Sequence, residues 1–376
     1  MTWLWPRPTR AAALALLLTW LSACAVSRAP IAIQTLTQRD YPSSLEITRK
    51  LGDFDGYSSY AVAWEADALR LTAVMNVPGA AMPDRGYPVL VMNHGNANNY
   101  WDTFKKYYSA AQDAEAYRAL PMTGLITRYA KEGFVVVFPD YRGHGYSETN
   151  GKSEGHWQLD RHGNRVVDRQ GQPVPRILDD DGLRFGGWLY TAHYTIDVLH
   201  LISALASISN PPEGFRIDQD NLFLWGRSLG GDVTARAMTA SRRVTAASLW
   251  VPATMSLWDQ AHHYHYDSPC CADGFSLEAL FVELKKYNAV HGTNFVTRDL
   301  DPANFINQVD NPVLIQVSID DTGVRSAWGI QYHYALREHG VPSELRVYDG
   351  SDHVFKGDVL EQAIRADLAF FRSHMQ

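Results

Sequence analysis

Short apolar runs alternate with helical patterns through most of the chain. Continuous apolar runs are typical of strands buried on both faces of a sheet. They predict strands at 89–92, 134–138, 222–225, 246–251, 313–317 and 345–348. Between them, apolar residues at helical spacing predict helices at 125–131, 193–207, 233–239, 328–338 and 359–371. Two earlier segments, 59–65 and 69–77, predict an antiparallel hairpin at a sheet edge.

This alternation predicts a single α/β domain with a mostly parallel, twisted sheet and helices on both faces. Ligands of such sheets bind beyond the carboxyl ends of the strands. Two segments, 148–189 and 255–301, interrupt the alternation, and each follows the carboxyl end of a predicted strand. We expect both to lie over that edge as cap segments that select the substrate.

One of the predicted strands ends in a candidate nucleophile. The sequence LFLWGRSLGG at 222–231 combines an apolar run, the pattern Gly-x-Ser-x-Gly around Ser228 and a following helix. This is the form of a nucleophile elbow, in which glycines flank the serine because a Cβ would clash with the strand and helix. The N–H of Leu229 would lie at the helix N-terminus, where it can stabilise an oxyanion. The alternative is an ordinary glycine-rich turn with a capping serine.

A serine nucleophile needs a base, and the base needs a group that orients it. With this kind of turn, the acid and then the histidine follow the serine in chain order. His353 directly follows the strand at 345–348, and Asp320 and Asp321 follow the strand at 313–317. We select Asp321 as the acid and keep Asp320 in reserve, because periodicity does not separate neighbours on a loop. The other downstream histidines are His262, His263, His265, His291, His333 and His339.

The loop after the strand at 89–92 supplies a second oxyanion donor in this scheme. It reads His94-Gly95-Asn96, and the glycine gives the backbone the freedom that such a loop requires. The backbone N–H of Asn96 is the predicted donor. The His94 side chain is expected to brace the loop rather than to transfer protons.

The first residues have the pattern of an export signal. Arg7 and Arg10 precede a short apolar run, and small residues then lead to Cys24. Such a segment is cleaved from the mature protein, which would comprise residues 24–376, and its apolar core is short for a permanent membrane span. Leu-Ser-Ala-Cys at 21–24 resembles the lipobox of bacterial lipoproteins, in which the cysteine is lipidated. A plain secretory peptide with an incidental cysteine is the alternative.

The net charge of the chain limits the classes of partner that we expect it to bind. Loss of 1–23 with its two arginines changes the formal net charge from −7 to −9. This acidity argues against nucleic acid, or an anionic bilayer surface, as the main partner. We expect a small ester or a short peptide as the substrate, and a membrane contact only through a lipid on Cys24.

Cysteine and histidine patterns give no strong metal signal. The sequence has no C-x-x-C pair, so we expect no structural zinc site. Cys270 and Cys271 are adjacent, and either a vicinal disulfide or two free thiols fits the sequence. The spacing of His262, His263 and His265 does not suit one helical face, so we favour pocket lining over metal binding and expect no cofactor.

Several blocks of the chain resemble bacterial α/β-hydrolases of the prolyl oligopeptidase (S9) group, specifically short members without a β-propeller. The blocks are VMNHGN, VVVFPDYRGHGYSE, TIDVLHLISAL, LFLWGRSLGG, PVLIQVSIDD and YDGSDHVF, in this order. By position, the resemblance implies Ser228 as nucleophile, Asp321 as acid, His353 as base, and Asn96 and Leu229 as oxyanion donors. Val317-Ser318 stands where the family has His-Gly, and the segment 148–189 is longer than the family pattern.

The sequence therefore predicts an exported serine hydrolase, lipid-anchored at Cys24 in a bacterial cell envelope. It would cleave a carboxylic ester, or an amide, through an acyl-enzyme. An S9-type exopeptidase is the first alternative. A non-catalytic envelope lipoprotein that uses the fold for binding is the alternative from another class.

Overall fold

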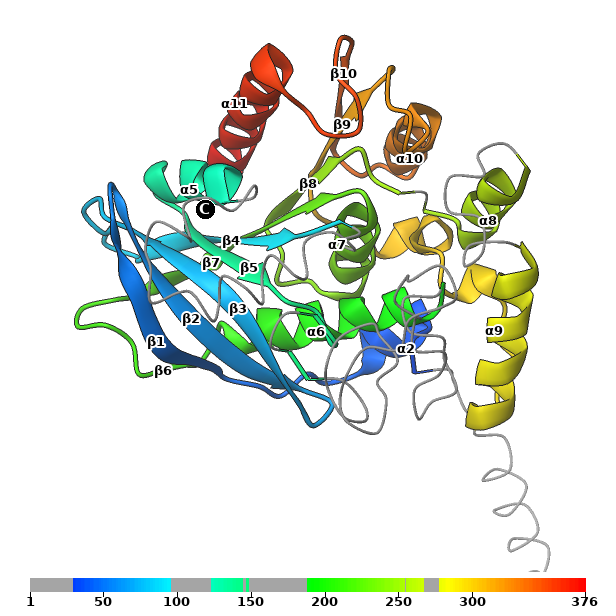
Figure 1. Ribbon diagram of the computed structural model, residues 1–376, viewed down its shortest axis with the longest axis horizontal. Coiled ribbons are helices and arrows are strands. Elements are labelled where there is room, and N and C mark those ends of the chain that lie inside the picture. Colours follow the sequence, from blue (N-terminus) through cyan, green and yellow to red (C-terminus); the bar gives the residue numbers. More distant parts are fainter. Residues whose placement is uncertain (1–29, 96–122, 145–146, 149–187, 254, 267–276) are drawn as a thin grey trace, which may run out of the picture.

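The computed structural model describes residues 30–95, 123–144, 147–148, 188–253, 255–266 and 277–376. These residues form one sheet in the order β10-β9-β8-β7-β4-β5-β3-β2-β1-β6 (Figure 1). The strands are β1 (Leu45–Phe54), β2 (Tyr57–Ala66), β3 (Leu69–Pro78), β4 (Tyr87–Asn93), β5 (Val135–Pro139), β6 (Ile208–Ser209), β7 (Ile217–Arg227), β8 (Ala246–Trp250), β9 (Val313–Ser318) and β10 (Ser343–Tyr348). The helices are α2 (Ile33–Gln38), α5 (Thr123–Lys131), α6 (Tyr190–Ala204), α7 (Leu229–Ala240), α8 (Leu257–Tyr266), α9 (Leu277–His291), α10 (Ser326–Glu338) and α11 (Gly357–Ser373), with short 3₁₀ helices η2 (Thr297–Asp299) and η3 (Pro302–Gln308).

The sheet is mostly parallel, as the alternation of strands and helices predicts. Neighbouring strands from β10 through β9, β8, β7 and β4 to β5 are all parallel. Beyond β5, the pairs β5–β3, β3–β2 and β2–β1 are antiparallel. The expected hairpin is therefore present as β2 and β3, but its expected place at the sheet edge is wrong, because β1 pairs with the outer side of β2.

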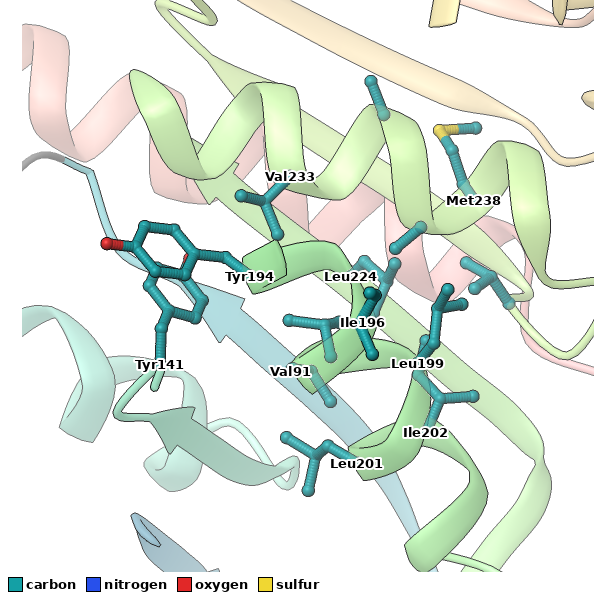
Figure 2. Close-up of a cluster of buried hydrophobic side chains, with 14 of the residues drawn as sticks. Val91, Tyr141, Tyr194, Ile196, Leu199, Leu201, Ile202, Leu224, Val233 and Met238 are labelled. Atoms are coloured by element: carbon teal, nitrogen blue, oxygen red, sulfur yellow. The ribbon is translucent and has the colours of Figure 1, made fainter. Parts of the chain in front are cut away.

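Side chains of the central strands alternate between two apolar clusters. In β7, Leu222 and Leu224 belong to one cluster, while Phe223 and Trp225 belong to the other. The first cluster packs against α6 and α7, and the second packs against α5 and α11, so helices cover both faces (Figure 1). Figure 2 shows part of the first cluster, where Val91 and Leu224 of the sheet meet Ile196 of α6. Burial on both faces explains why these strands are apolar without alternation.

The residues between β8 and β9 form α8, α9, η2 and η3. In Figure 1, α8 and α9 lie beyond the end of the sheet toward which the β4 arrow points. Asp301 fixes the start of this segment, since its Oδ1 accepts a hydrogen bond from the Leu257 N–H at 2.9 Å. Arg236 of α7 donates to the carbonyl of Leu300 beside it. The segment 255–301 is thus bonded to the helix that follows the candidate nucleophile.

A buried carboxylate joins the last helix to the sheet. Asp367 of α11 is fully buried. Its carboxylate accepts four hydrogen bonds on the face of the sheet that α5 and α11 cover. The donors are Tyr129 Oη at 2.5 Å, Ser248 Oγ at 2.5 Å, Gln316 Nε2 at 2.6 Å and Trp250 Nε1 at 3.0 Å. Four donors satisfy both carboxylate oxygens. This arrangement fixes the orientation of Trp250, whose carbonyl contacts the candidate nucleophile.

Some sequence predictions concern residues outside the described ranges. They are the signal 1–23, Cys24, Asn96, Cys270, Cys271 and nearly all of 148–189. No helix in the described ranges combines the length and apolarity needed to cross a bilayer.

Candidate active site

Ser228 lies on the turn between β7, at the centre of the parallel strands, and α7. Its backbone has φ 57° and ψ −125°, a conformation that costs free energy in a residue with a side chain. Backbone hydrogen bonds hold the turn in place. The Ser228 N–H donates to Trp250 O at 3.0 Å, and Ser228 O accepts from the N–H groups of Gly231 at 2.9 Å and Ala253 at 3.0 Å. The surrounding structure therefore enforces the strained geometry expected of a nucleophile elbow.

The glycines around Ser228 allow the turn to pack closely. A Cβ at Gly226 would overlap the carbonyl of Gly230, and a Cβ at Gly230 would overlap the carbonyl of Asn93 at the end of β4. A Cβ at Gly231 would lie 2.7 Å from the Cβ of Pro252. The three glycines are thus required by close approach of strand, turn and helix, as the sequence predicts.

The loop after β4 passes directly beside the serine. A Cβ built on Gly95 would lie 3.1 Å from Ser228 Cβ, which places the backbone of Gly95 in contact with the serine. Leu229 is the first residue of α7, so its N–H is at a helix N-terminus and has no intrahelical acceptor. The predicted donor Asn96 follows Gly95 but lies outside the described residues.

The structure brings Asp321, and not Asp320, to His353. The distance from Asp321 Oδ2 to His353 Nδ1 is 2.9 Å. Asp321 Oδ1 accepts from the N–H groups of Gly323 and Val324, both at 2.8 Å. The Asp321 side chain is 1% exposed and that of His353 is 27% exposed. A carboxylate at Nδ1 favours the tautomer with Nδ1–H, which leaves Nε2 as an acceptor for a proton.

Two further carboxylates connect the loops that carry Asp321 and His353. Asp320 Oδ2 accepts from the Gly350 N–H at 2.6 Å. Asp352 Oδ1 accepts from the N–H and hydroxyl of Thr322, at 2.9 and 3.0 Å, and from the His353 N–H at 2.7 Å. These hydrogen bonds lower the pKa of Asp352. Sequence reasoning missed this brace, although the position of Asp352 next to His353 is a signal for it.

The other histidines occupy different places. His333 Nδ1 lies 2.9 Å from Ser343 Oγ, and His339 Nδ1 lies 2.9 Å from the carbonyl of Ala335 at the end of α10. His291 ends α9 and packs its ring against Tyr287. His262 and His263 lie on α8. In the part of the chain that the structure describes, no group of three or more metal-ligating side chains occurs.

An aromatic stack supports the loop after β4. The His94 and Tyr141 rings lie 4.3 Å apart, and Tyr141 stacks on Tyr194 of α6 at 4.6 Å and 11° (Figure 2). Tyr141 Oη donates to the His94 carbonyl at 3.1 Å. Burial lowers the pKa of His94 to about 4, so its ring is neutral at pH 7. The neutral ring and the anchored carbonyl fix the backbone that leads to Gly95.

The hydroxyl of Tyr141 provides a test of this support. Tyr141→Phe keeps the stacked ring and removes one hydrogen bond, which contributes about 0.5–1.5 kcal/mol. We expect kcat for p-nitrophenyl acetate to fall roughly two- to tenfold, with little change in KM. Tyr194→Phe is the matched control and should change kcat less than Tyr141→Phe, because the Tyr194 Oη to His144 Nε2 distance is already 3.4 Å. An unchanged kcat in Tyr141→Phe would mean that the hydroxyl does not position this loop.

A buried ion pair holds the loop after β5, and sequence reasoning did not assign it. Arg142 donates to Asp197 Oδ1 through Nε at 2.9 Å and Nη2 at 2.6 Å. The Arg142 N–H donates to Asp197 Oδ2 at 2.8 Å. Both side chains are almost completely buried. The pair therefore attaches the start of the loop after β5 to α6.

A mostly parallel sheet, with a strained serine at the turn after a central strand, defines the α/β-hydrolase fold. The chain is a serine hydrolase of this class. Residues 199–376 match the model of the prolyl oligopeptidase family, which supports an S9-type α/β-hydrolase.

Solved structures with the same fold are distant in sequence. A Paenibacillus acetyl xylan esterase aligns with a TM-score of 0.57 and 16% identity, over 91% of this chain and 92% of the esterase. The acylaminoacyl peptidase of Pyrococcus horikoshii aligns with a TM-score of 0.50 and 17% identity, over 85% of this chain and 42% of the peptidase. A puromycin hydrolase aligns with a TM-score of 0.51 and 18% identity, over 89% of this chain and 39% of the hydrolase. No curated protein matches the sequence significantly.

Proposed function

We propose that the chain hydrolyses a carboxylic ester with Ser228 as nucleophile, His353 as base and Asp321 as orienting acid. The observation that carries this proposal is the 2.9 Å contact of a buried Asp321 with His353, on loops after consecutive parallel strands. The strained turn at Ser228 supports it independently. The three residues also have the chain order that the fold requires.

The proposed chemistry proceeds in two acyl transfers. His353 Nε2 takes the proton of the Ser228 hydroxyl as Oγ bonds to the ester carbonyl carbon. The oxyanion is stabilised by the N–H groups of Leu229 and Asn96. His353 then gives the proton to the departing alcohol, which leaves an acyl group on Ser228. A water molecule, deprotonated by His353, attacks the acyl carbon and releases the acid and the free serine.

The share of each similar structure that this chain matches favours ester hydrolysis over peptide cleavage. The esterase from Paenibacillus is matched over 92% of its length, whereas the two other structures extend well beyond the part that this chain matches. The match to the prolyl oligopeptidase family supports an exopeptidase as the second candidate.

Turnover of matched chromogenic substrates tests the choice. We expect kcat/KM for p-nitrophenyl acyl esters to exceed that for aminoacyl and dipeptidyl anilides by at least about a hundredfold. This ratio corresponds to a difference of roughly 2.7 kcal/mol in activation free energy. Strong anilide turnover with negligible ester turnover would reject the esterase. A fluorophosphonate probe should label the folded wild-type protein and not Ser228→Ala. Absence of labelling in the wild type would favour a non-catalytic binding protein.

A further inference from the structure

A network of hydrogen bonds joins the loop that carries Asp321 to the loop that carries His353. Its centre is Asp352, which directly precedes His353 in the chain. The Asp352 Oδ1 atom accepts from the Thr322 N–H at 2.9 Å, from the Thr322 hydroxyl at 3.0 Å and from the His353 N–H at 2.7 Å. One carboxylate oxygen is therefore bonded to the residue after the proposed acid and to the backbone of the proposed base.

The residues on either side of Thr322 contact the imidazole of His353. The residue before it is Asp321, whose Oδ2 lies 2.9 Å from His353 Nδ1. The residue after it is Gly323, and a Cβ built there would lie 3.2 Å from Cγ of the His353 ring, so its backbone lies against the ring. A shift of the Thr322 backbone away from Asp352 would move both neighbours of the imidazole. Asp352 therefore acts on the ring by two routes, through the His353 N–H and through the facing loop.

Further bonds attach the same two loops near the ends of β9 and β10. The Ser318 hydroxyl donates to the carbonyl of Ser351, and both residues are buried. Asp320 Oδ2 accepts from the Gly350 N–H at 2.6 Å. Ser318 stands where the S9 group has glycine, which has no side chain to make this bond. The loops are thus joined where they leave the sheet, and Asp352 adds an attachment next to the base.

The attachment through Asp352 lies at the surface, whereas the acid beside it is buried. Asp352 and Thr322 are exposed, but the Asp321 side chain is 1% exposed. A single exposed charge pair contributes little, because water competes for both partners. Here three donors converge on one ionised oxygen, and hydrogen bonds to an ionised acceptor are stronger than those between neutral groups. Because the donors come from two loops, their convergence restricts how the loops move relative to each other.

We propose that Asp352 is a positioning residue that, together with Thr322, holds His353 and Asp321 in the arrangement required for proton transfer. The function of its carboxylate is to accept hydrogen bonds from both loops. Asparagine, whose amide oxygen can accept the same bonds, should therefore replace it, and alanine should not. This inference rests on the proposed reaction at Ser228, and it adds two residues that act on that reaction through the acid and the base.

Substitutions at Asp352 should change kcat and leave KM nearly unchanged. Asp352→Ala should lower kcat for p-nitrophenyl acetate about tenfold, the effect of one lost hydrogen bond to a charged group. Asp352→Asn should keep at least about half of the wild-type kcat, because the bonds are retained. Asp349→Ala is the matched control and should leave kcat unchanged, since Asp349 is exposed on the same loop and forms no hydrogen bond or ion pair with the residues that the structure describes. An equal loss in Asp352→Asn and Asp352→Ala would overturn the hydrogen-bonding role.

A double-mutant cycle tests the route through the facing loop. Thr322→Val removes the hydroxyl that donates to Asp352 Oδ1 and keeps the shape of the side chain. It should lower kcat about two- to fivefold in the wild type. In Asp352→Ala the same substitution should have no further effect, because both changes remove the same bond. Losses that add in full would overturn this route.

Proton NMR of the full-length protein gives a readout that needs no turnover. The hydrogen-bonded Nδ1–H of His353 should give a low-field resonance, which Asp321→Asn should abolish. Asp352→Ala should weaken this resonance through faster exchange with water, whereas Asp352→Asn and Asp349→Ala should keep it. Thr322→Val should weaken it in part, which tests the network even where Asp352→Ala does not fold. An unchanged resonance in Asp352→Ala would overturn the proposal. If the wild type hydrolyses no ester, the proposed function fails, while this resonance still supports or rejects the role of Asp352.

Discussion

Ser228→Ala and His353→Ala are each expected to lower kcat for a p-nitrophenyl ester by about 10⁴- to 10⁶-fold. Without the hydroxyl no acyl-enzyme forms, and without the imidazole no group takes the hydroxyl proton. Because the two residues act as one unit, the double variant should be no slower than the worse single variant. The residual rate would come from the oxyanion donors and from substrate binding. Rates are measured against spontaneous hydrolysis, with circular dichroism to check that each variant is folded.

A substitution at a second histidine, His339, is the control for His353→Ala. His339 lies at the C-terminal end of α10, is exposed, and its Nδ1 lies 2.9 Å from the carbonyl of Ala335 in its own helix. His339→Ala should therefore change kcat by less than about twofold, as most surface substitutions do. If His353→Ala kept a tenth or more of the wild-type kcat, another group would have to be the base.

Asp321→Asn is expected to lower kcat by about 10⁴-fold without unfolding the protein. Asp321 Oδ1 accepts two backbone hydrogen bonds from Gly323 and Val324, so the amide oxygen of asparagine would take that place. Its NH₂ group would then face His353 Nδ1. The imidazole would have to accept at Nδ1 and carry its proton on Nε2, which is the tautomer that cannot deprotonate Ser228. The loss should appear in kcat with little change in KM.

Asp320→Asn is the control from the adjacent position. Asp320 accepts a hydrogen bond from the Gly350 N–H, and the amide oxygen of asparagine can accept the same bond. We expect kcat to fall by no more than about threefold, the effect of weakening one hydrogen bond. A larger loss in Asp320→Asn than in Asp321→Asn would reverse the assignment of the acid.

The fold was predictable where burial leaves a clear pattern. The runs that became β7, β8 and β9 are apolar because both faces of each strand are covered by helices. β1 escaped prediction for the opposite reason. In its sequence LEITRKLGDF only Leu45 and Ile47 are buried, since the strand lies near the edge of the sheet. Without a repeating apolar face, an outer strand cannot be distinguished from a loop by periodicity.

In the candidate site, too, some residues could be predicted from a sequence pattern and others could not. Ser228 could be predicted from the sequence because the close packing of strand and helix requires glycines at fixed spacing. That requirement produces a recognisable motif. The choice between Asp320 and Asp321 depends on which way each side chain leaves the loop, which periodicity does not encode, and the resemblance to the family blocks was the only sequence signal for Asp321. The pairing of Arg142 with Asp197 joins residues far apart in the chain. Such long-range pairs appear only when the sheet order is known.

The contact of Trp250 with both Ser228 and Asp367 has a consequence for how activity is acquired during synthesis. The Trp250 carbonyl accepts from the Ser228 N–H, while its indole N–H donates to Asp367 of α11. A ribosome that paused after His353 had emerged would expose a chain with all three proposed reacting residues but without the acceptor that orients this indole. Such a nascent chain would leave four buried donors unpaired and lack the apolar residues of α11. Hydrolysis should therefore begin only after α11 has docked, which makes the docking of that helix a switch between an inert and a reactive serine.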